Sequence, residues 1–318
     1  MTYNYDPELR DFAAMAPDFS FEDPAAARAG LAAMVANANA GLDATAINID
    51  ETFIEGPQGA GVGLRVRIYS PKRPAASTVP ALLCLHAGGF VIGDLDTEHA
   101  SIAGFCERLG IVVVSVDYRL APEHPYPAAL DDCYCALQWL HAQAGDLGVD
   151  RSRIGVYGLS AGGALAAALT LLARDRGGPA LCFQYLGVPV LDDRMDSVSM
   201  RTFVDTPLWN RPTAALSWKY YLGAAYEPGA VDIPAYAAPA RATDVSRLPP
   251  TYIVAAEFDP LRDENIAYAV RLLEAGVPVE LHVYSGTFHG SQINENAKIT
   301  QRQQRETLEV LKRGLRIA

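Results

Sequence analysis

The chain has 318 residues, of which 50% are hydrophobic and 20% are charged. This composition supports a large packed core and excludes a disordered chain. The formal net charge of −11 repels phosphate backbones and anionic lipid headgroups, which excludes nucleic acid and stable membrane association as expected partnerships. A neutral or cationic small molecule fits this charge better.

The N-terminal region predicts two short helices, at residues 7–16 and 24–38, separated by the turn-rich segment PDFSFED. The opening residues, MTYNYDPELRDF, contain acidic side chains and no apolar stretch typical of a secretory signal. Apolar runs elsewhere are broken well before the roughly 20 residues that cross a bilayer. We therefore expect the protein to reside in the cytoplasm.

After Gly41 the pattern changes to strands. Residues 48–55 and 64–69 alternate polar and apolar side chains, as a half-solvated antiparallel pair does. Continuously apolar strands then alternate with helices, which predicts right-handed βαβ units and a mostly parallel eight-stranded sheet flanked by helices. The apolar strands are expected at 81–86, 111–117, 153–158, 182–188, 251–257 and 279–284, and the helices at 98–109, 128–142, 161–174, 263–275 and 294–313.

Residues 192–233 interrupt this alternation with prolines and clustered aromatic side chains. We interpret them as a cap insertion and the first 45 residues as N-terminal cap helices. The α/β catalytic domain then comprises residues 46–191 and 234–318. Among the cap aromatics, Phe203, Trp209 and Trp218 are candidates for lining a substrate pocket, with plain packing as the alternative.

The segment Gly158–Gly163 reads Gly-Leu-Ser-Ala-Gly-Gly and lies between a predicted strand and a predicted helix. A nucleophile at this point needs a sharp turn, which flanking glycines permit, and the helix N-terminus offers free amides to an oxyanion. The pattern Gly-x-Ser-x-Gly alone arises by chance in roughly one of ten such chains, so a glycine-rich turn is the alternative. Its position favours Ser160 as a nucleophile.

The segment His86–Phe90 reads His-Ala-Gly-Gly-Phe and follows the strand at 81–86. Such a loop can present consecutive amides to the negative oxygen that develops during acyl transfer. We expect an oxyanion hole formed by the amides of Gly88, Gly89 and Ala161, the last being the residue after the nucleophile. His86 is expected to hold this loop through hydrogen bonds.

A serine hydroxyl needs a general base, and in hydrolases with this type of turn the chain order is serine, acid, histidine. Only His282 and His289 come late enough. His282 falls inside a predicted strand, whereas His289 follows that strand in the loop GTFHGS. We therefore predict His289 as the base.

The acid must lie between Ser160 and His289, directly after a strand. Asp259 follows the strand TYIVAAE and is the predicted orienting carboxylate. Asp263 and Glu264 begin the next helix, where dipole and capping effects account for carboxylates. Asp192 and Asp193 also follow a strand but lead into the expected cap, so they remain weaker alternatives.

The five cysteines lie mostly in apolar runs, and a chain of this size does not need disulfides to fold. We expect them to be reduced core residues. Cys133 and Cys135 are two apart in a predicted helix and face different directions, which argues against a metal site. No metal and no cofactor is expected.

These motifs together resemble the hormone-sensitive-lipase-like carboxylesterases of the α/β-hydrolase fold, from about Leu64 to the C-terminus. The family's loop and elbow correspond to His86–Gly89 and Gly158–Gly163. Its Asp-Pro-Leu-x-Asp-Glu segment and its Tyr-Arg-Leu-Ala-Pro-Glu hallmark correspond to Asp259–Glu264 and Tyr118–Glu123. Bacterial members of the heroin-esterase kind are the most similar, especially across 198–223. The resemblance implies that both cap segments cover the site, and that dimers form through the edge strand at 279–284.

Two positions depart from the family pattern. Ala87 replaces the first glycine of the loop, which a residue at negative φ tolerates because the donors are its two successors. Leu159 stands where the family often has aspartate, and we expect it to change selectivity while activity is retained.

The resulting prediction is a serine carboxylesterase that hydrolyses short- to medium-chain esters through an acyl-enzyme. The same residues would also serve an amidase or a lactonase. A non-catalytic small-molecule receptor on this fold is a third hypothesis, but His289 speaks against it.

Overall fold

The computed structural model describes residues 3–17, 20–57 and 63–317. Its centre is an eight-stranded sheet with the order β1-β2-β4-β3-β5-β6-β7-β8. The pairs β1–β2 and β2–β4 are antiparallel, and all other neighbours are parallel. The predicted mostly parallel sheet is thus confirmed. The strands are β1 (Ile47–Ile54), β2 (Leu64–Pro71), β3 (Val79–Leu85), β4 (Val112–Val116), β5 (Val149–Leu159), β6 (Phe183–Gly187), β7 (Thr251–Phe258) and β8 (Val279–Phe288).

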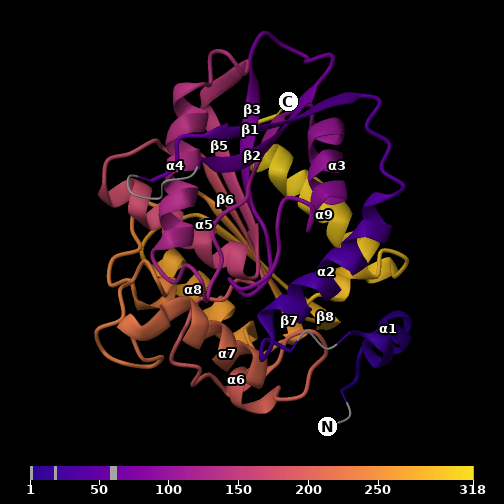
Figure 1. Cartoon of the computed structure of the whole chain (residues 1–318), viewed down its shortest axis with the longest axis vertical. Helices are drawn as coiled ribbons and strands as arrows, with labels where there is room; N and C mark the ends of the chain where they lie inside the picture. Colours follow the sequence, from indigo (N-terminus) through magenta and orange to yellow (C-terminus); the bar gives the residue numbers. More distant parts are fainter. Residues whose placement is uncertain (1–2, 18–19, 58–62, 318) are drawn as a thin grey trace.

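Helices cover both faces of this sheet (Figure 1). One layer contains α4 (Ala128–Ala142), α5 (Ala161–Asp175) and α8 (Arg262–Glu274). The opposite layer contains α3 (His99–Leu109) and α9 (Lys298–Gly314). The central strands are apolar throughout because each face packs against a helix layer.

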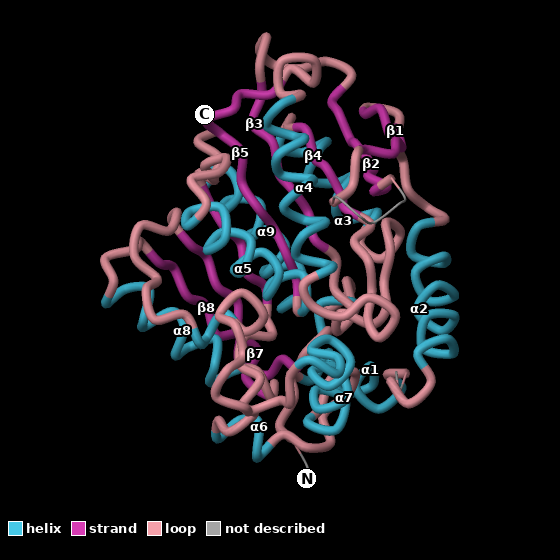
Figure 2. Tube along the Cα trace, turned by 60° about the vertical axis from the view of Figure 1, so that its left-hand side comes forward, coloured by secondary structure: helices cyan, strands magenta, loops and turns pink. Residues whose placement is uncertain are grey.

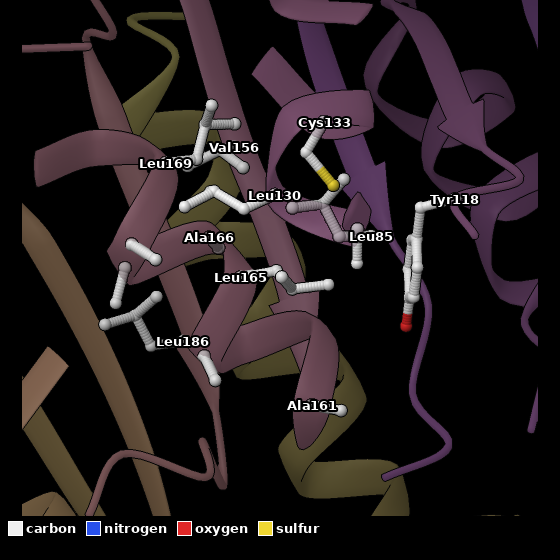
Figure 3. Close-up of a cluster of buried hydrophobic side chains, with 14 of the residues drawn as sticks. Leu85, Tyr118, Leu130, Cys133, Val156, Ala161, Leu165, Ala166, Leu169 and Leu186 are labelled. Carbon is white, nitrogen blue, oxygen red and sulfur yellow. The ribbon is translucent and has the colours of Figure 1, made fainter. Parts of the chain in front are cut away.

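Strand β3 illustrates this double burial. Leu83 and Leu85 join the core under α4 and α5, whereas Leu82 and Cys84 join the core under α3 and α9. Successive side chains of a strand point to opposite faces, so both sets must be apolar. Figure 3 shows the first of these cores, in which Leu165 of α5 lies in one cluster with side chains of the sheet and of α4.

The remaining helices are α1 (Arg10–Met15), α2 (Pro24–Asn39), α6 (Val198–Thr202) and α7 (Arg211–Leu222). In both views, α1, α6 and α7 lie at the end of the molecule away from the C-terminus (Figures 1 and 2). The carboxyl ends of the parallel strands point the same way, towards the residues predicted to be functional. The division into two caps and a catalytic domain at residues 45, 191 and 233 stays a prediction.

The last helix begins later than expected. We predicted a helix from residue 294, but a short 3-10 turn at Ser291–Ile293 precedes α9, which starts at Lys298. The Lys298 amide donates to the carboxylate of Glu8 at 2.6 Å. A carboxylate from the far end of the chain thus caps the first turn of α9, and no local pattern around residue 298 could reveal it.

No helix in the described ranges is both long enough and apolar enough to cross a bilayer. All five cysteines are unpaired, and four of them are buried.

The core makes a direct stability prediction. Leu165 is fully buried, so Leu165→Ala should lower the free energy of unfolding by about 2–5 kcal/mol through lost burial and a residual cavity. Urea denaturation measures this loss. Val231 is 97% exposed, and the control Val231→Ala should stay within about 0.5 kcal/mol. Equal effects of the two substitutions would contradict the assigned packing.

Candidate active site

Ser160 occupies the turn between β5 and α5 with φ 54° and ψ −116°. An L-residue rarely adopts this conformation, and such strain persists only where the surroundings enforce it. Two backbone hydrogen bonds do so: the Ser160 amide donates to the Gly187 carbonyl at 2.7 Å, and the Val190 amide donates to the Ser160 carbonyl at 3.2 Å. The turn therefore has the geometry of a nucleophile elbow.

The elbow needs a glycine in the first turn of α5. A Cβ at Gly162 would lie 2.0 Å from the Leu85 carbonyl oxygen at the end of β3. Only glycine allows this approach. The N-terminus of α5 therefore lies against the point where the loop 86–90 begins.

The structure brings the predicted serine, histidine and aspartate together from three separate loops. His289 Nε2 lies 2.9 Å from Ser160 Oγ, and His289 Nδ1 lies 2.8 Å from Asp259 Oδ2. The other Asp259 oxygen accepts a hydrogen bond from the Leu261 amide at 2.9 Å. Asp259 is fully buried, while Ser160 and His289 are 4% and 7% exposed.

The hydrogen-bond directions follow from this geometry. An ionised carboxylate can only accept, so the His289 Nδ1–H donates to Asp259. Nε2 is then the unprotonated nitrogen, and it accepts from the Ser160 hydroxyl. This tautomer is the one a general base requires, because the free lone pair faces the serine proton.

The predicted oxyanion loop is shaped around Gly88. Its φ is 132°, and a Cβ there would lie 2.0 Å from the Ile92 carbonyl oxygen. The Gly88 carbonyl accepts hydrogen bonds from the amides of Val91 and Ile92, both at 3.0 Å. The amides of Gly88, Gly89 and Ala161 donate to no other residue in the described part of the chain, so they are free donors. An oxyanion hole formed by these three amides stays a prediction.

The backbone amide and the backbone carbonyl of Ala87 each have a side-chain partner. Only one of these partners, His86, was expected from the sequence. The Ala87 amide donates to the Glu98 carboxyl at 2.9 Å, and the Ala87 carbonyl lies 2.7 Å from His86 Nδ1. Tyr118 stacks on the His86 ring and donates to the His86 carbonyl at 2.7 Å. The expected role of His86 in holding the loop agrees with these contacts, whereas Glu98 was read only as the start of a helix.

Glu98 is an unusual carboxyl. Its second oxygen is buried without a hydrogen-bond partner among the described residues, and no ion pair within them joins it to a lysine or arginine. Burial raises the pKa of Glu98 to about 7, although the Ala87 hydrogen bond acts in the opposite direction.

The three cap aromatics lie in different places. Trp209 stacks on His289 with ring centroids 5.4 Å apart. Trp218 is fully buried against Phe90, and Phe203 packs edge-on against Phe258 at 6.0 Å. The structure therefore brings Trp209 to His289, and a substrate-binding role for these aromatics stays a prediction.

The alternative candidates for the acid and for the base make contacts away from Ser160. Glu264 accepts from the Leu191 amide at 2.7 Å, and Asp263 accepts from the Ser199 amide at 2.7 Å. We expected helix-end effects to account for both carboxyls, but they tie α8 to the segment after β6. His282 stacks on Tyr284 within β8.

Across the described residues, no cluster of three or more histidine, cysteine, aspartate or glutamate side chains could hold a metal ion. The chemistry available at the site is thus that of a serine, an imidazole, a carboxylate and free amides. This set suits acyl transfer.

Comparison with known proteins matches residues 82–293 to the family of the α/β-hydrolase fold. The chain belongs to the α/β-hydrolase family. This α/β-hydrolase is 40% identical to esterase LipI of Mycobacterium tuberculosis, over 77% of its own length and 75% of the relative. It is also 36% identical to an arylesterase of Saccharolobus solfataricus, over 71% and 72% of the two chains.

Solved structures of other α/β-hydrolases agree with this family. Bacterial heroin esterase matches with a TM-score of 0.96 at 47% identity, with 98% of both chains covered. Esterase LipW from Mycobacterium marinum matches with a TM-score of 0.88 at 38% identity, with 98% and 96% covered. The expected likeness to the hormone-sensitive-lipase-like esterases, including those of the heroin-esterase kind, is confirmed.

Glu98 gives this site a pH-dependent stability. Because its pKa is raised from the ordinary 4.5 to about 7, the folded protein retains a proton that the unfolded chain loses between these values. The free energy of unfolding therefore falls as pH rises through this window. Glu98→Gln keeps an acceptor for Ala87 and removes the titration, so its stability relative to the parent should rise between pH 5 and pH 8.

The measurement is the difference in urea midpoint between variant and parent at each pH. Glu227→Gln, at an exposed carboxyl, reports the general effect of removing one negative charge. A Glu98→Gln difference that does not change with pH would contradict the prediction.

Proposed function

We propose that this α/β-hydrolase is a serine carboxylesterase that hydrolyses short- to medium-chain carboxylic esters through an acyl-enzyme. Ser160 is the nucleophile, His289 the general base and Asp259 the carboxylate that orients the base. The observation that carries this proposal is the continuous hydrogen-bond chain through the three side chains, at 2.9 Å and 2.8 Å. Relatives named esterases over most of the chain support an ester as the bond that is cut.

In the first half of the reaction, His289 Nε2 takes the hydroxyl proton as Ser160 Oγ attacks the ester carbonyl carbon. The carbonyl oxygen becomes an oxyanion, which the amides of Gly88, Gly89 and Ala161 stabilise. The carbon–oxygen bond to the alcohol then breaks, and His289 returns the proton to the departing oxygen. The product is an ester between Ser160 and the acyl group.

In the second half, water takes the place of the alcohol. His289 removes one of its protons as the oxygen attacks the acyl carbon, and the same amides hold the second oxyanion. Collapse of this intermediate releases the carboxylic acid and returns the proton to Ser160. Asp259 keeps the imidazole in one orientation during both halves.

An amidase or a lactonase would use the same residues, so the geometry alone leaves the bond open. The names of the relatives favour the ester. A non-catalytic receptor on this fold would lack the general base. His289 lies within hydrogen-bond reach of Ser160, which argues against a receptor.

We also propose that two copies of the chain pair through β8. This strand is at the edge of the sheet, and its Val283 side chain is 39% exposed. An unpaired edge is a ready template for a second strand. The free thiols fit a reducing compartment, so we place the enzyme in the cytoplasm, acting on small-molecule esters.

The test of the catalytic residues is hydrolysis of p-nitrophenyl esters from acetate to decanoate. We expect turnover by the parent, and Ser160→Ala should reduce kcat by about 10⁴-fold or more because the nucleophile is lost. His289→Ala should cause a similar loss, and the double variant should lose little more, since the residues act as a unit. An active Ser160→Ala enzyme would falsify the assignment.

A parallel assay tests whether the enzyme cleaves ester, amide or lactone bonds most efficiently. The acyl groups that give the fastest p-nitrophenyl esters are offered as anilides and as lactones of similar size. We expect esters to be turned over fastest; a higher kcat/KM for either other class would replace the esterase proposal by that class.

The dimer is tested by sedimentation. The parent should sediment as a dimer, and Val283→Asp should shift it towards monomer because a charge on each edge strand opposes their pairing. Val231→Asp is the control, since Val231 is 97% exposed in the segment between α7 and β7. A monomeric parent, or equal behaviour of the two variants, would refute the interface.

A further inference from the structure

Helix α7 contacts the loop that carries two of the expected oxyanion donors. The Ser217 hydroxyl of this helix donates to the Gly89 carbonyl at 2.8 Å, and Ser217 is fully buried. Four residues later, the Tyr221 ring stacks on the Phe90 ring with centroids 3.8 Å apart. Residues four apart lie on one face of a helix, so a single face of α7 holds two successive residues of the loop.

The loop needs partners outside itself because its backbone is strained. Gly88, Gly89 and Phe90 all have positive φ, at 132°, 57° and 63°. Glycine adopts such values readily, but an L-residue such as Phe90 does so only where the surroundings enforce it. Without these partners the loop would relax, and the amides of Gly88 and Gly89 would change direction.

Every backbone carbonyl from Ala87 to Val91 has a hydrogen-bond partner. Two of these partners are side chains from distant helices. Ser217 of α7 binds the Gly89 carbonyl, and Arg28 Nε of α2 donates to the Val91 carbonyl at 2.9 Å. Both helices lie in the segments predicted as caps, so side chains from outside the sheet complete the set.

The Arg28 contact reaches the Gly89 amide through two peptide groups. In a trans peptide the N–H and the C=O point in opposite directions, so a partner that fixes one also fixes the other. Arg28 fixes the Val91 carbonyl. The N–H of the same peptide, on Ile92, donates to the Gly88 carbonyl at 3.0 Å. The N–H that shares a peptide with this second carbonyl is the Gly89 amide, an expected oxyanion donor.

Arg28 is itself held by the segment that carries the Tyr118–Glu123 motif. Its two Nη atoms donate to the two Glu123 carboxylate oxygens at 2.8 and 2.7 Å, and Nη2 also donates to the Ala121 carbonyl at 3.1 Å. A bidentate pair of this kind fixes the guanidinium plane. The Ala121 amide in turn donates to the Phe90 carbonyl at 2.9 Å, which joins this motif to the same loop.

We propose that Ser217 and Arg28 are positioning residues of the reaction. By holding the carbonyls of Gly89 and Val91, they direct the two glycine amides of the loop at the developing oxyanion. This proposal rests on the esterase function proposed above. It gives α2 and α7 a part in the chemical step, besides the expected one of covering the site.

The first test variant is Ser217→Ala, which removes the hydroxyl that binds the loop. Its control is Thr251→Val, which removes another buried hydroxyl that donates to a backbone carbonyl, that of Pro249, at 2.9 Å. Thr251 is at the start of β7, the end of the strand away from Asp259. Ser217→Thr retains a hydroxyl at the same position and tests for rescue.

The second test variant is Arg28→Met, which removes the guanidinium. Its control is Arg153→Met, because Arg153 binds Asp150 at 2.8 Å and its side chain is 25% exposed, against 32% for Arg28. Arg153 lies in the part of β5 away from the nucleophile turn. Thermal unfolding shows whether each variant is folded.

Hydrolysis of p-nitrophenyl acetate measures turnover, and two ketones report on the oxyanion. Ser160 Oγ adds to the carbonyl carbon of 1,1,1-trifluoro-4-phenylbutan-2-one. The hydroxyl proton passes to His289, and the electron pair of the carbonyl double bond stays on the oxygen as an oxyanion. The matched ketone 4-phenylbutan-2-one lacks the activating fluorines and binds without this bond.

Ser217→Ala should lower kcat about tenfold and leave KM within about twofold, because the direction of the amides matters once the oxyanion forms. Loss of a whole donor costs about 10²–10³-fold, and a misdirected donor costs less. The inhibition constant of the trifluoromethyl ketone should also rise about tenfold, with no change for 4-phenylbutan-2-one.

Arg28→Met should show the same pattern with an effect of about fivefold, since it acts through one more peptide group. Ser217→Thr should recover most of the lost kcat. The two controls, Thr251→Val and Arg153→Met, should keep the parent's kcat even where they lower its thermal stability.

Each other outcome contradicts a stated claim. A parent enzyme that does not hydrolyse p-nitrophenyl acetate contradicts the esterase function itself. With an active parent, an unchanged kcat in Ser217→Ala, an equal loss in Thr251→Val, or an equal weakening of both ketones overturns the positioning role alone. So does a Ser217→Thr enzyme that is as slow as Ser217→Ala. If Ser217→Ala does not fold, the Arg28 and Arg153 pair decides in its place.

Discussion

The site depends on one strained backbone position. Ser160 keeps φ at 54° because its amide is hydrogen-bonded to the last residue of β6 and its carbonyl to the segment that follows, and because Gly162 lets α5 approach the end of β3. Relaxing this turn would change the direction of the hydroxyl and of the Ala161 amide together. Such strain persists only where the surrounding structure enforces it. Here the packed sheet and its helix layers keep the backbone of Ser160 in this conformation.

Burial decides how the other groups behave. Asp259 is fully enclosed, so its attraction to a protonated imidazole is weakly screened and its position is fixed by two hydrogen bonds. Glu98 is enclosed as well, and burial raises its pKa to about 7 although the Ala87 amide donates to one of its oxygens. Its second oxygen has no hydrogen-bond partner among the described residues, so burial is only partly offset.

Much of this arrangement could be predicted from the sequence. Ser160, Asp259 and His289 each directly follow a recognisable strand, and parallel strands bring their carboxyl ends to one edge. Glu98 and Glu264 could not be predicted, because a carboxylate in the first turn of a helix already has a local explanation. Their partners, the amides of Ala87 and Leu191, lie 11 and 73 residues away. Likewise, the aromatic pattern of 192–233 does not reveal which ring meets His289.

The capping of α9 by Glu8 has a consequence for how the protein is made. Glu8 and the Lys298 amide that it binds are 290 residues apart, so the carboxylate is made long before its partner. The contact forms only after Lys298 and the helix that it begins have left the ribosome. Until then the apolar face of the sheet beneath α9 stays open to solvent and to chaperones.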